Sequence, residues 1–388
     1  MNNNLNIDKP YPLEDVLVID LTHVLAGPTC ARMLADGGAR VIHVERKKLG
    51  DDTRAMGPYM PDGSSEYFRI ANVGKESIAL NFKDPEDFAL LKNMISKADV
   101  VVENFRPGVM TKLGLDPHEL LKEFPHLIVA SISGFGQFGP MSKQGAFDTV
   151  IQAVSGIMDS TGTKEGGPTR VGTSISDIIG GIFGYAGIVT ALYAREKTGK
   201  GTTVDIAMLD STFALMSQGL MTVLGKNERI ERIGNRHPYM YPFDTFMTSD
   251  TSLAICTGND HLFEILAQEL NHKEWVEDDR FNTNEKRSIN WKPLKDLIEN
   301  ELRKDTADNW EKKLLEVGIP TSKVLNLADT CKMPQIIERG MVKELKDGNL
   351  IPGTPMKFST WNSYGIKNDS PTLDEEGKSI RAEFSNKN

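Results

Sequence analysis

Cysteine is scarce in this sequence, and its few cysteines lie far apart. The 388 residues include three, at Cys30, Cys256 and Cys331. An odd number at wide spacing argues against a disulfide framework and favours a reducing compartment. The chain also lacks Cys-x-x-Cys, His-Glu-x-x-His and comparable ligand spacings, so we expect no dedicated metal site. The expected compartment is the cytoplasm.

Basic residues are fewer than acidic ones. Lysine and arginine number 45 against 54 aspartates and glutamates, which gives a net charge of −9 at pH 7. Because nucleic acids and anionic membranes attract positively charged surfaces, neither is expected as a partner. The first residues show no basic segment followed by an apolar run, so no signal peptide is expected. The longest apolar stretch, Ile175 to Tyr193, contains Asp177 and several glycines, which favours a helix buried in protein over a membrane span.

Short apolar runs alternate with helical patterns in the N-terminal half. The runs that predict buried strands are 16–20, 40–45, 99–103 and 127–133. Helical patterns occur at 27–36 and 90–97. Strands that are apolar on both faces, separated by helices, are typical of a parallel sheet covered on both sides. We therefore predict an α/β fold with a doubly wound, Rossmann-like large domain.

The composition changes after residue 224, where charged and aromatic residues become frequent. A chain of 388 residues is too long for one core at roughly 100–200 residues per domain. We expect a large domain at 1–224, a smaller α+β domain at 225–325, and a C-terminal segment at 326–388 that returns to the large domain.

A glycine pattern at Gly134 to Gly139 matches the Gly-x-Gly-x-x-Gly of dinucleotide-binding folds and follows a predicted strand. That fingerprint also needs a helix that begins at the third glycine. Here Pro140 to Gly145 predicts a loop. An NAD-linked oxidoreductase is therefore disfavoured, although the glycines allow close approach of a ligand or a neighbouring chain.

One carboxylate stands at the start of an apolar helix. Small residues at 171–176 lead to Asp177, which Gly180 and Gly181 follow. From the residues alone, capping of the helix N-terminus is the simpler interpretation. The functional alternative is that helix N–H groups hold the carboxylate ionised while the glycines leave room for a bulky ligand. Such a carboxylate can attack a thioester and form a reactive anhydride.

Many short motifs follow one another along nearly the whole chain. Their positions are 13–16, 26–28, 41–46, 50–54, 80–83, 99–108, 133–140, 147–153, 198–201, 205–208, 258–260 and 281–284, together with Arg287. No single motif is decisive, but the ordered series resembles the class III CoA-transferases. This is the family of formyl-CoA transferase and carnitine CoA-transferase, which also contains α-methylacyl-CoA racemase.

The resemblance implies an acyl-CoA:carboxylate CoA-transferase with Asp177 as its nucleophile. Asp177 would attack the donor acyl-CoA to form an anhydride, and the returning thiolate would leave an aspartyl-CoA thioester. The acceptor carboxylate would then open that thioester. The implied substrates are acyl-CoA and a free carboxylic acid, without a tightly bound cofactor. The implied assembly is an interlocked homodimer.

A CoA-binding cleft is implied in the same way. The residues expected to bind CoA are Val24, Leu25, Ala26, Arg46, Leu80, Lys83, Asn104, Phe105, Arg106, Lys112 and Phe135. Cations at strand ends suit the phosphates of CoA, although each alone equally fits a solvated surface charge. Formyl-CoA transferase has glutamine at the position of Leu25 and tyrosine at that of Phe135, which indicates a less polar acyl group here than oxalate or formate.

Two alternatives use the same fold. The racemase branch needs a second acid or base beside the shared aspartate. It has histidine where this chain has Phe147 and an acidic residue where it has Asn259, and neither side chain here can shuttle protons at neutral pH. The second alternative, a non-catalytic CoA-binding protein, stays open from sequence.

Overall fold

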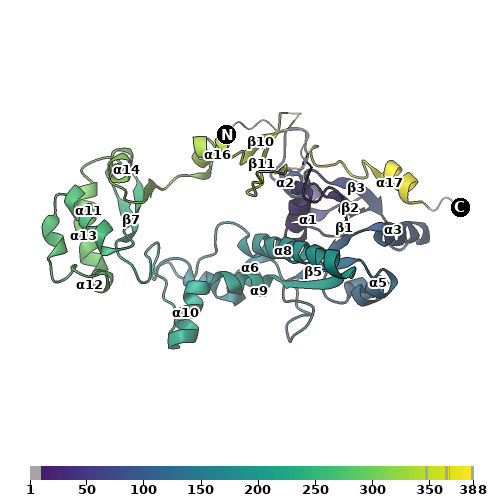
Figure 1. Cartoon of the computed structure of the whole chain (residues 1–388), viewed down its shortest axis with the longest axis horizontal. Helices are drawn as coiled ribbons and strands as arrows, with labels where there is room; N and C mark the ends of the chain where they lie inside the picture. The colour runs from purple at the N-terminus through teal and green to yellow at the C-terminus, as the bar shows by residue number, and fades with distance from the viewer. Residues whose placement is uncertain (1–9, 346–347, 363–365, 367, 386–388) are drawn as a thin grey trace. The chain divides into compact units, whose positions relative to one another are not determined.

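The computed structural model describes residues 10–345, 348–362, 366 and 368–385. Two compact units divide the chain. The larger unit comprises residues 1–158, 170–228 and 335–388, and the smaller one comprises 159–169 and 229–334. Figure 1 labels many of the elements of both units.

The smaller unit includes a segment, 159–169, that the sequence analysis placed in the large domain. Asp159 accepts hydrogen bonds from Arg229 and Arg232, at 3.1 and 2.7 Å. The N–H of Gly234 donates to the carbonyl of Gly162 at 2.9 Å. These contacts tie the segment to residues about 70 positions later. The smaller unit then runs from 229 to 334, where the sequence analysis set 225 to 325.

The larger unit contains a six-stranded sheet in the order β3-β2-β1-β4-β5-β6. The strands are β1 (Leu17–Asp20), β2 (Arg40–Arg46), β3 (Glu76–Leu80), β4 (Val100–Glu103), β5 (Ile128–Ser133) and β6 (Thr202–Ala207). All neighbouring pairs are parallel. The strand order reverses between β1 and β4, which is the position where open α/β sheets bind ligands. The predicted doubly wound parallel sheet is confirmed.

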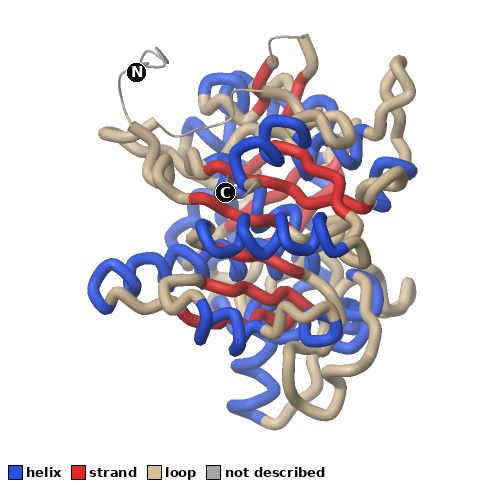
Figure 2. Tube along the Cα trace, turned by 90° about the vertical axis from the view of Figure 1, so that its right-hand side faces the viewer, coloured by secondary structure: helices blue, strands red, loops and turns tan. Residues whose placement is uncertain are grey.

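Alternating residues of the strands enter two cores, one on each face of the sheet. Val18 packs with α1 (Ala26–Asp36) and α8 (Ile175–Thr198). Ile19 packs on the opposite face with α3 (Pro85–Lys97), α5 (Pro117–Glu123) and the C-terminal helix α17 (Gly377–Phe384). Figure 2 shows helices, in blue, beside the strands, in red. Both faces of the sheet are therefore covered.

The other elements of the larger unit are short. They are η1 (Asp52–Ala55), α2 (Glu66–Asn72), α4 (Val109–Lys112), α6 (Asp148–Ser155), α9 (Met208–Leu215), α10 (Ser217–Lys226), β10 (Val342–Glu344) and β11 (Leu350–Pro352). Two helices, α7 (Ile157–Ser160) and α16 (Pro334–Glu338), lie where the chain passes between the units. The residues after Gly139 form a loop up to α6, as predicted, so the glycine pattern does not open a helix.

The smaller unit is α+β, as predicted. An antiparallel sheet joins β7 (Phe243–Met247), β8 (Ser252–Cys256) and β9 (Thr321–Lys323). Its helices are α11 (Asp260–Glu269), η2 (Lys273–Val276), α12 (Asn284–Ile289), α13 (Trp291–Leu302), α14 (Ala307–Glu316) and α15 (Leu327–Thr330). A core of its own, which includes Phe246, Phe263 and Trp310, holds the sheet to the helices.

Helix α8 is the one helix among the described residues that is long and apolar enough to span a membrane, judged by length and composition alone. One face is buried, with Gly181, Gly184 and Ile188 toward α1 and the sheet. Phe183 and Tyr193 on other faces remain exposed. The expectation of a buried helix is thus met on one face only.

Candidate active site

Asp177 is the third residue of α8 rather than its N-cap. The cap position is Ser174, whose side chain makes no capping hydrogen bond. Instead, the N–H of Ser176, in the first turn of α8, donates to Oδ1 of Asp148 at 3.0 Å. Asp148 begins α6 and is buried, so a carboxylate 28 positions before Ser176 performs the capping role that composition alone assigned to Asp177. The carboxylate of Asp177 remains in the positive first turn of a long helix.

The pKa of Asp177 is raised to about 7. Burial of the carboxyl group is the largest cause, and the charge of Asp148 adds to it. Arg170, whose Nε lies 3.3 Å from Oδ2 of Asp148, acts in the opposite direction. Burial raises the pKa of Tyr67 of α2, and the nearby charge of Asp177 raises it further. A carboxyl group that titrates near neutrality is a candidate functional group.

The two glycines after Asp177 serve packing rather than ligand space. A Cβ at Gly181 would lie 2.7 Å from the carbonyl oxygen of Ala26 and 2.8 Å from Cβ of Thr29. A Cβ at Gly180 would lie 3.1 Å from Cγ of Met208. The idea that these glycines leave room for a ligand is therefore wrong, because α1 and α9 occupy the space.

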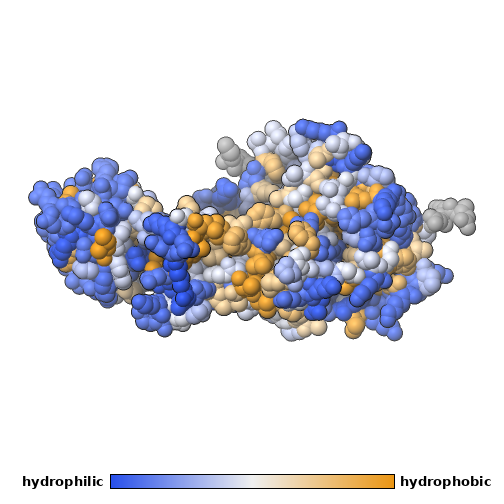
Figure 3. Space-filling view, turned by 90° about the horizontal axis from the view of Figure 1, so that it is seen from below, coloured by the Kyte–Doolittle hydropathy of each residue, from blue (hydrophilic) through white to orange (hydrophobic). Residues whose placement is uncertain are grey.

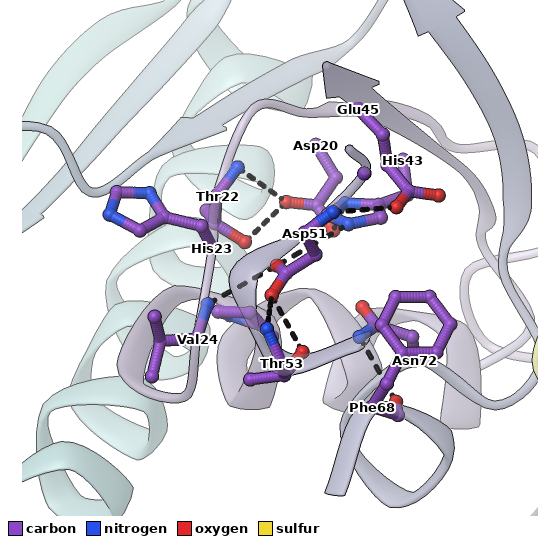
Figure 4. A network of polar contacts seen from close by, with 12 residues as sticks. Asp20, Thr22, His23, Val24, His43, Glu45, Asp51, Thr53, Phe68 and Asn72 are labelled. Atoms are coloured by element: carbon purple, nitrogen blue, oxygen red, sulfur yellow. Dashed lines mark hydrogen bonds and ion pairs between the residues drawn. The ribbon is translucent and has the colours of Figure 1, made fainter. Parts of the chain in front are cut away.

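The loop before α1 lies next to the first turns of α8. Its last residues lead into Ala26, whose carbonyl touches α8 at Gly181, about one turn after Asp177. Side chains hold its backbone. The N–H of His23 donates to Asn104 Oδ1 at 2.9 Å. The N–H of Val24 donates to Asp51 Oδ2 at 3.2 Å (Figure 4). Asn104 also donates back to the carbonyl of His23 at 2.8 Å.

A cavity of about 660 Å³ opens at the carboxyl ends of β1, β2, β3 and β4. Four predicted CoA-binding residues line it, namely Arg46, Leu80, Lys83 and Phe105. Its size is within the usual range for small-ligand sites. Lys47, Lys48 and Asn81 also line the cavity and were not predicted; they directly follow the ends of β2 and β3. Their position after a predicted strand end was the available signal.

The other predicted contacts lie outside the set of residues that line this cavity. Asn104 binds the backbone of His23, and the guanidinium of Arg106 packs against Gly145. Lys112 is exposed at the end of α4. Phe135 is buried in the core beneath α1 and α8, and so it supports the fold at this position. Val24 and Leu25 lie in the loop beside α8, and Ala26 is the first residue of α1.

The chain is similar to known proteins along nearly its whole length. A family model described as CoA-transferase family III matches residues 13–377. The acetyl-CoA:oxalate CoA-transferase of Acetobacter aceti is 47% identical over 375 residues, which cover 96% of each chain. The succinyl-CoA:glutarate CoA-transferase of Mus musculus is 35% identical and covers 97% of this chain and 87% of the relative. A CAIB/BAIF family protein from Brucella suis, solved by crystallography, is 36% identical with a TM-score of 0.88, covering 97% of this chain and all of the other.

Proposed function

Because the chain belongs to CoA-transferase family III, we propose that it moves CoA from an acyl-CoA to a free carboxylic acid through a covalent intermediate on Asp177. The observation that carries this proposal is the environment of Asp177. Its carboxyl group is largely buried in the first turn of α8, beside Asp148, with a pKa raised to about 7. Such a group is ionised in part at neutral pH and is held away from bulk water.

The proposed reaction divides one exchange into four attacks. The Asp177 carboxylate attacks the donor thioester, which releases CoA thiolate and forms an aspartyl-acyl anhydride. The thiolate attacks the aspartyl carbonyl, which releases the donor acid and forms an aspartyl-CoA thioester. The acceptor carboxylate attacks the carbonyl of that thioester, which forms an aspartyl-acyl anhydride with the acceptor and again releases the thiolate. The thiolate then attacks the acceptor's carbonyl, so that the new acyl-CoA leaves and the carboxylate of Asp177 is restored.

The cavity at the strand ends supports a binding place for the nucleotide part of CoA. Arg46, Lys47 and Lys83 place cations at a cleft that Leu80 and Phe105 make apolar. Arg46 is paired with Asp52 and Lys47 with Asp87, so a phosphate would compete with these carboxylates for the two cations. Phosphates favour such cations, and the adenine ring favours the apolar surfaces. The loop 22–26 joins this cavity, which Thr22 and His23 line, to the start of α8. The pantetheine arm would follow this loop from the cavity toward Asp177.

We propose a small dicarboxylate as the acceptor, with oxalate as the first to test. The relatives named above act on oxalate and on glutarate. The choice of oxalate departs from the expectation drawn from Leu25 and Phe135, which favoured a less polar acid. Phe135 is buried in the core, which weakens that expectation. An interlocked homodimer and a cytoplasmic location complete the proposal.

The test is mass spectrometry of the protein after a single turnover. Wild type mixed with acetyl-CoA is expected to carry CoA on the peptide that contains Asp177, in a form that hydroxylamine releases. With oxalate labelled with oxygen-18, Asp177 should gain one heavy oxygen, because the acceptor's oxygen remains on the aspartate. Asp177→Asn should show neither signal, whereas Asp62→Asn, an exposed carboxylate of the same unit, should show both. Turnover without label on Asp177 would contradict the covalent route.

A further inference from the structure

A group of buried charges lies beneath the loop 22–24, and Figure 4 labels four of its members. His43, Glu45 and Asp51 also line the cavity proposed for CoA, but no member of the group forms or breaks a bond in the proposed reaction. The carboxylates belong to Asp20, Glu45 and Asp51, and the cations to His43, Lys75 and Arg54. The side chains of Asp20, His43, Asp51 and Lys75 are at most 1% exposed. Buried charges are costly unless they are paired, so this arrangement constrains its surroundings closely.

His43 lies between two of the carboxylates. Its Nδ1 lies 3.1 Å from Oδ2 of Asp20, and its Nε2 faces Oδ2 of Asp51 at 3.7 Å, an ion-pair distance. Nε2 has no hydrogen-bond partner among the described residues. Burial alone lowers the pKa of His43, but the two carboxylates outweigh it and raise the pKa to about 9. The ring is therefore an imidazolium at neutral pH.

The same two carboxylates hold the loop. Oδ1 of Asp20 accepts the N–H and the hydroxyl of Thr22, at 3.0 and 2.5 Å. Oδ2 of Asp51, the atom that faces His43, accepts the N–H of Val24 at 3.2 Å. In Figure 4 Asp51 lies between Val24 and His43. The imidazolium of His43 therefore lies between Asp20, which binds Thr22, and Asp51, which binds Val24.

Val24 needs this support because its backbone is strained. Its φ is +67°, in the left-handed region that β-branched residues rarely adopt. Such conformations persist only where the surroundings impose them. Two residues later, Ala26 begins α1 and touches Gly181 of α8, about one turn from Asp177. The conformation of Val24 therefore sets how the loop meets the start of α8.

Resting on the proposed CoA transfer at Asp177, we propose that His43 is a positioning residue of this enzyme. As an imidazolium that bridges Asp20 and Asp51, it holds Val24 in the left-handed conformation and fixes the loop 22–26 against α8 beside the nucleophile. Asp51 is the direct contact to the loop, and His43 acts through it.

The proposal implies a dependence on alkaline pH. The charged or titratable groups that face His43 are Asp20 of β1, Asp51 before η1, Lys75 before β3, Glu45 of β2 and His23 of the loop. The ring of Phe68 from α2 packs beside His43, with 6.3 Å between the two ring centroids. Above pH 9 the imidazolium loses its proton, and Asp51 then has no cation at its Val24-binding oxygen. The loop is expected to loosen, and kcat to fall with a midpoint near pH 9.

The experiment compares His43→Gln, His43→Lys and the control His118→Gln, which changes an exposed histidine of α5. Measured for each are kcat, KM and the dissociation constant of free CoA from pH 7 to 10.5, below the melting temperature of every variant. His43→Gln should lose roughly tenfold or more in kcat, because the loop geometry beside the nucleophile is altered. Since His43 also lines the cavity proposed for CoA, the dissociation constant of CoA should change as well, but by less than kcat. The fall of kcat near pH 9 that is expected of the wild type should also be absent from His43→Gln. His43→Lys keeps the charge, so it should retain most of kcat and move that limb upward.

A double-mutant cycle with Val24→Gly tests the route through the loop. Glycine adopts positive φ without strain, so the loss from His43→Gln should be smaller in a Val24→Gly background. Additive losses would contradict the proposal, as would an unchanged kcat or an unmoved alkaline limb in His43→Gln. If His43→Gln does not fold, His43→Lys provides the test. An alkaline limb of kcat that moves upward in His43→Lys supports the proposal, and a limb that stays near pH 9 contradicts it.

Failure of this inference can be separated from failure of the proposed function. Labelling of Asp177 in the wild type reports on the function, whatever His43 does. A labelled, active wild type with an equally active His43→Gln overturns only the role of His43. An unlabelled wild type overturns the covalent reaction and with it the premise of this inference.

Discussion

Asp148 and Arg170 act on Asp177 with opposite sign, and this opposition gives a prediction at the residue scale. Asp177 must be ionised to attack, and its pKa of about 7 lies above the ordinary value of 3.8, so kcat/KM should rise as pH passes through 7. Asp148→Asn removes a neighbouring negative charge but keeps an acceptor for Ser176. The pKa of Asp177 should therefore fall, and the acidic limb of kcat/KM should shift down by about one pH unit. Arg170→Gln should shift it up. The measurement is kcat/KM from pH 5 to 9.

The control for this shift is Asp62→Asn, which changes an exposed carboxylate and should leave the limb unmoved. If Asp148→Asn leaves the acidic limb of kcat/KM where it is in wild type, Asp177 is not the group that titrates. The position of Asp177 could be predicted from sequence, but its electrostatic partner could not. Asp148 reaches the start of α8 from another helix, and no local pattern marks that contact.

At the scale of elements, the packing of α8 on α1 depends on a glycine. A Cβ at Gly181 would come within 2.8 Å of both Ala26 and Thr29, and the carbonyl oxygen is backbone that cannot turn away. We predict that Gly181→Ala lowers the free energy of unfolding by about 1–3 kcal/mol, although alanine favours the helix itself. Because the helices separate where Asp177 stands, kcat should fall as well. Chemical denaturation and steady-state kinetics measure the two effects.

Gly225→Ala is the matched control, because Gly225 lies in α10 and a Cβ there would meet no other atom within 4 Å. It should leave stability equal or raise it by about 0.4–1 kcal/mol. Equal stability of Gly181→Ala and wild type would mean that α8 and α1 are less closely packed than the structure indicates. The role of Gly181 also shows a limit of sequence reasoning. The glycine was recognisable as special, but whether a ligand or a helix fills the space beside it depends on which element the fold places there.

At the scale of the whole molecule, the sheet was the most predictable part. Strands at 16–20, 40–45, 99–103 and 127–133 appear as β1, β2, β4 and β5, because continuous apolar runs suit a sheet buried on both faces. The ordered motifs also predicted the family, which the comparisons confirm. The placement of 159–169 in the smaller unit could not be predicted, since it depends on Asp159 meeting Arg229 and Arg232.

The larger unit also carries apolar side chains that its own fold leaves exposed. Figure 3 shows apolar residues, in orange, on one face of the molecule. Exposed large ones include Val154 of α6, Phe213 of α9 and Leu224 of α10. Exposed apolar residues on successive helices are typical of protein interfaces. If the proposed homodimer forms, light scattering after size exclusion should give twice the chain mass of 43.0 kDa at micromolar concentration.

The dimer prediction can be tested further at Phe213, which is 48% exposed. Phe213→Asp places a charge where a partner would bury the ring, so the dimer should dissociate. The substitution leaves the larger unit's own cores intact, because Phe213 belongs to neither. Leu327→Asp is the control, since Leu327 is 77% exposed on α15 of the smaller unit. A mass of 43.0 kDa for wild type would remove the dimer from the proposal while leaving the chemistry of Asp177 to its own test.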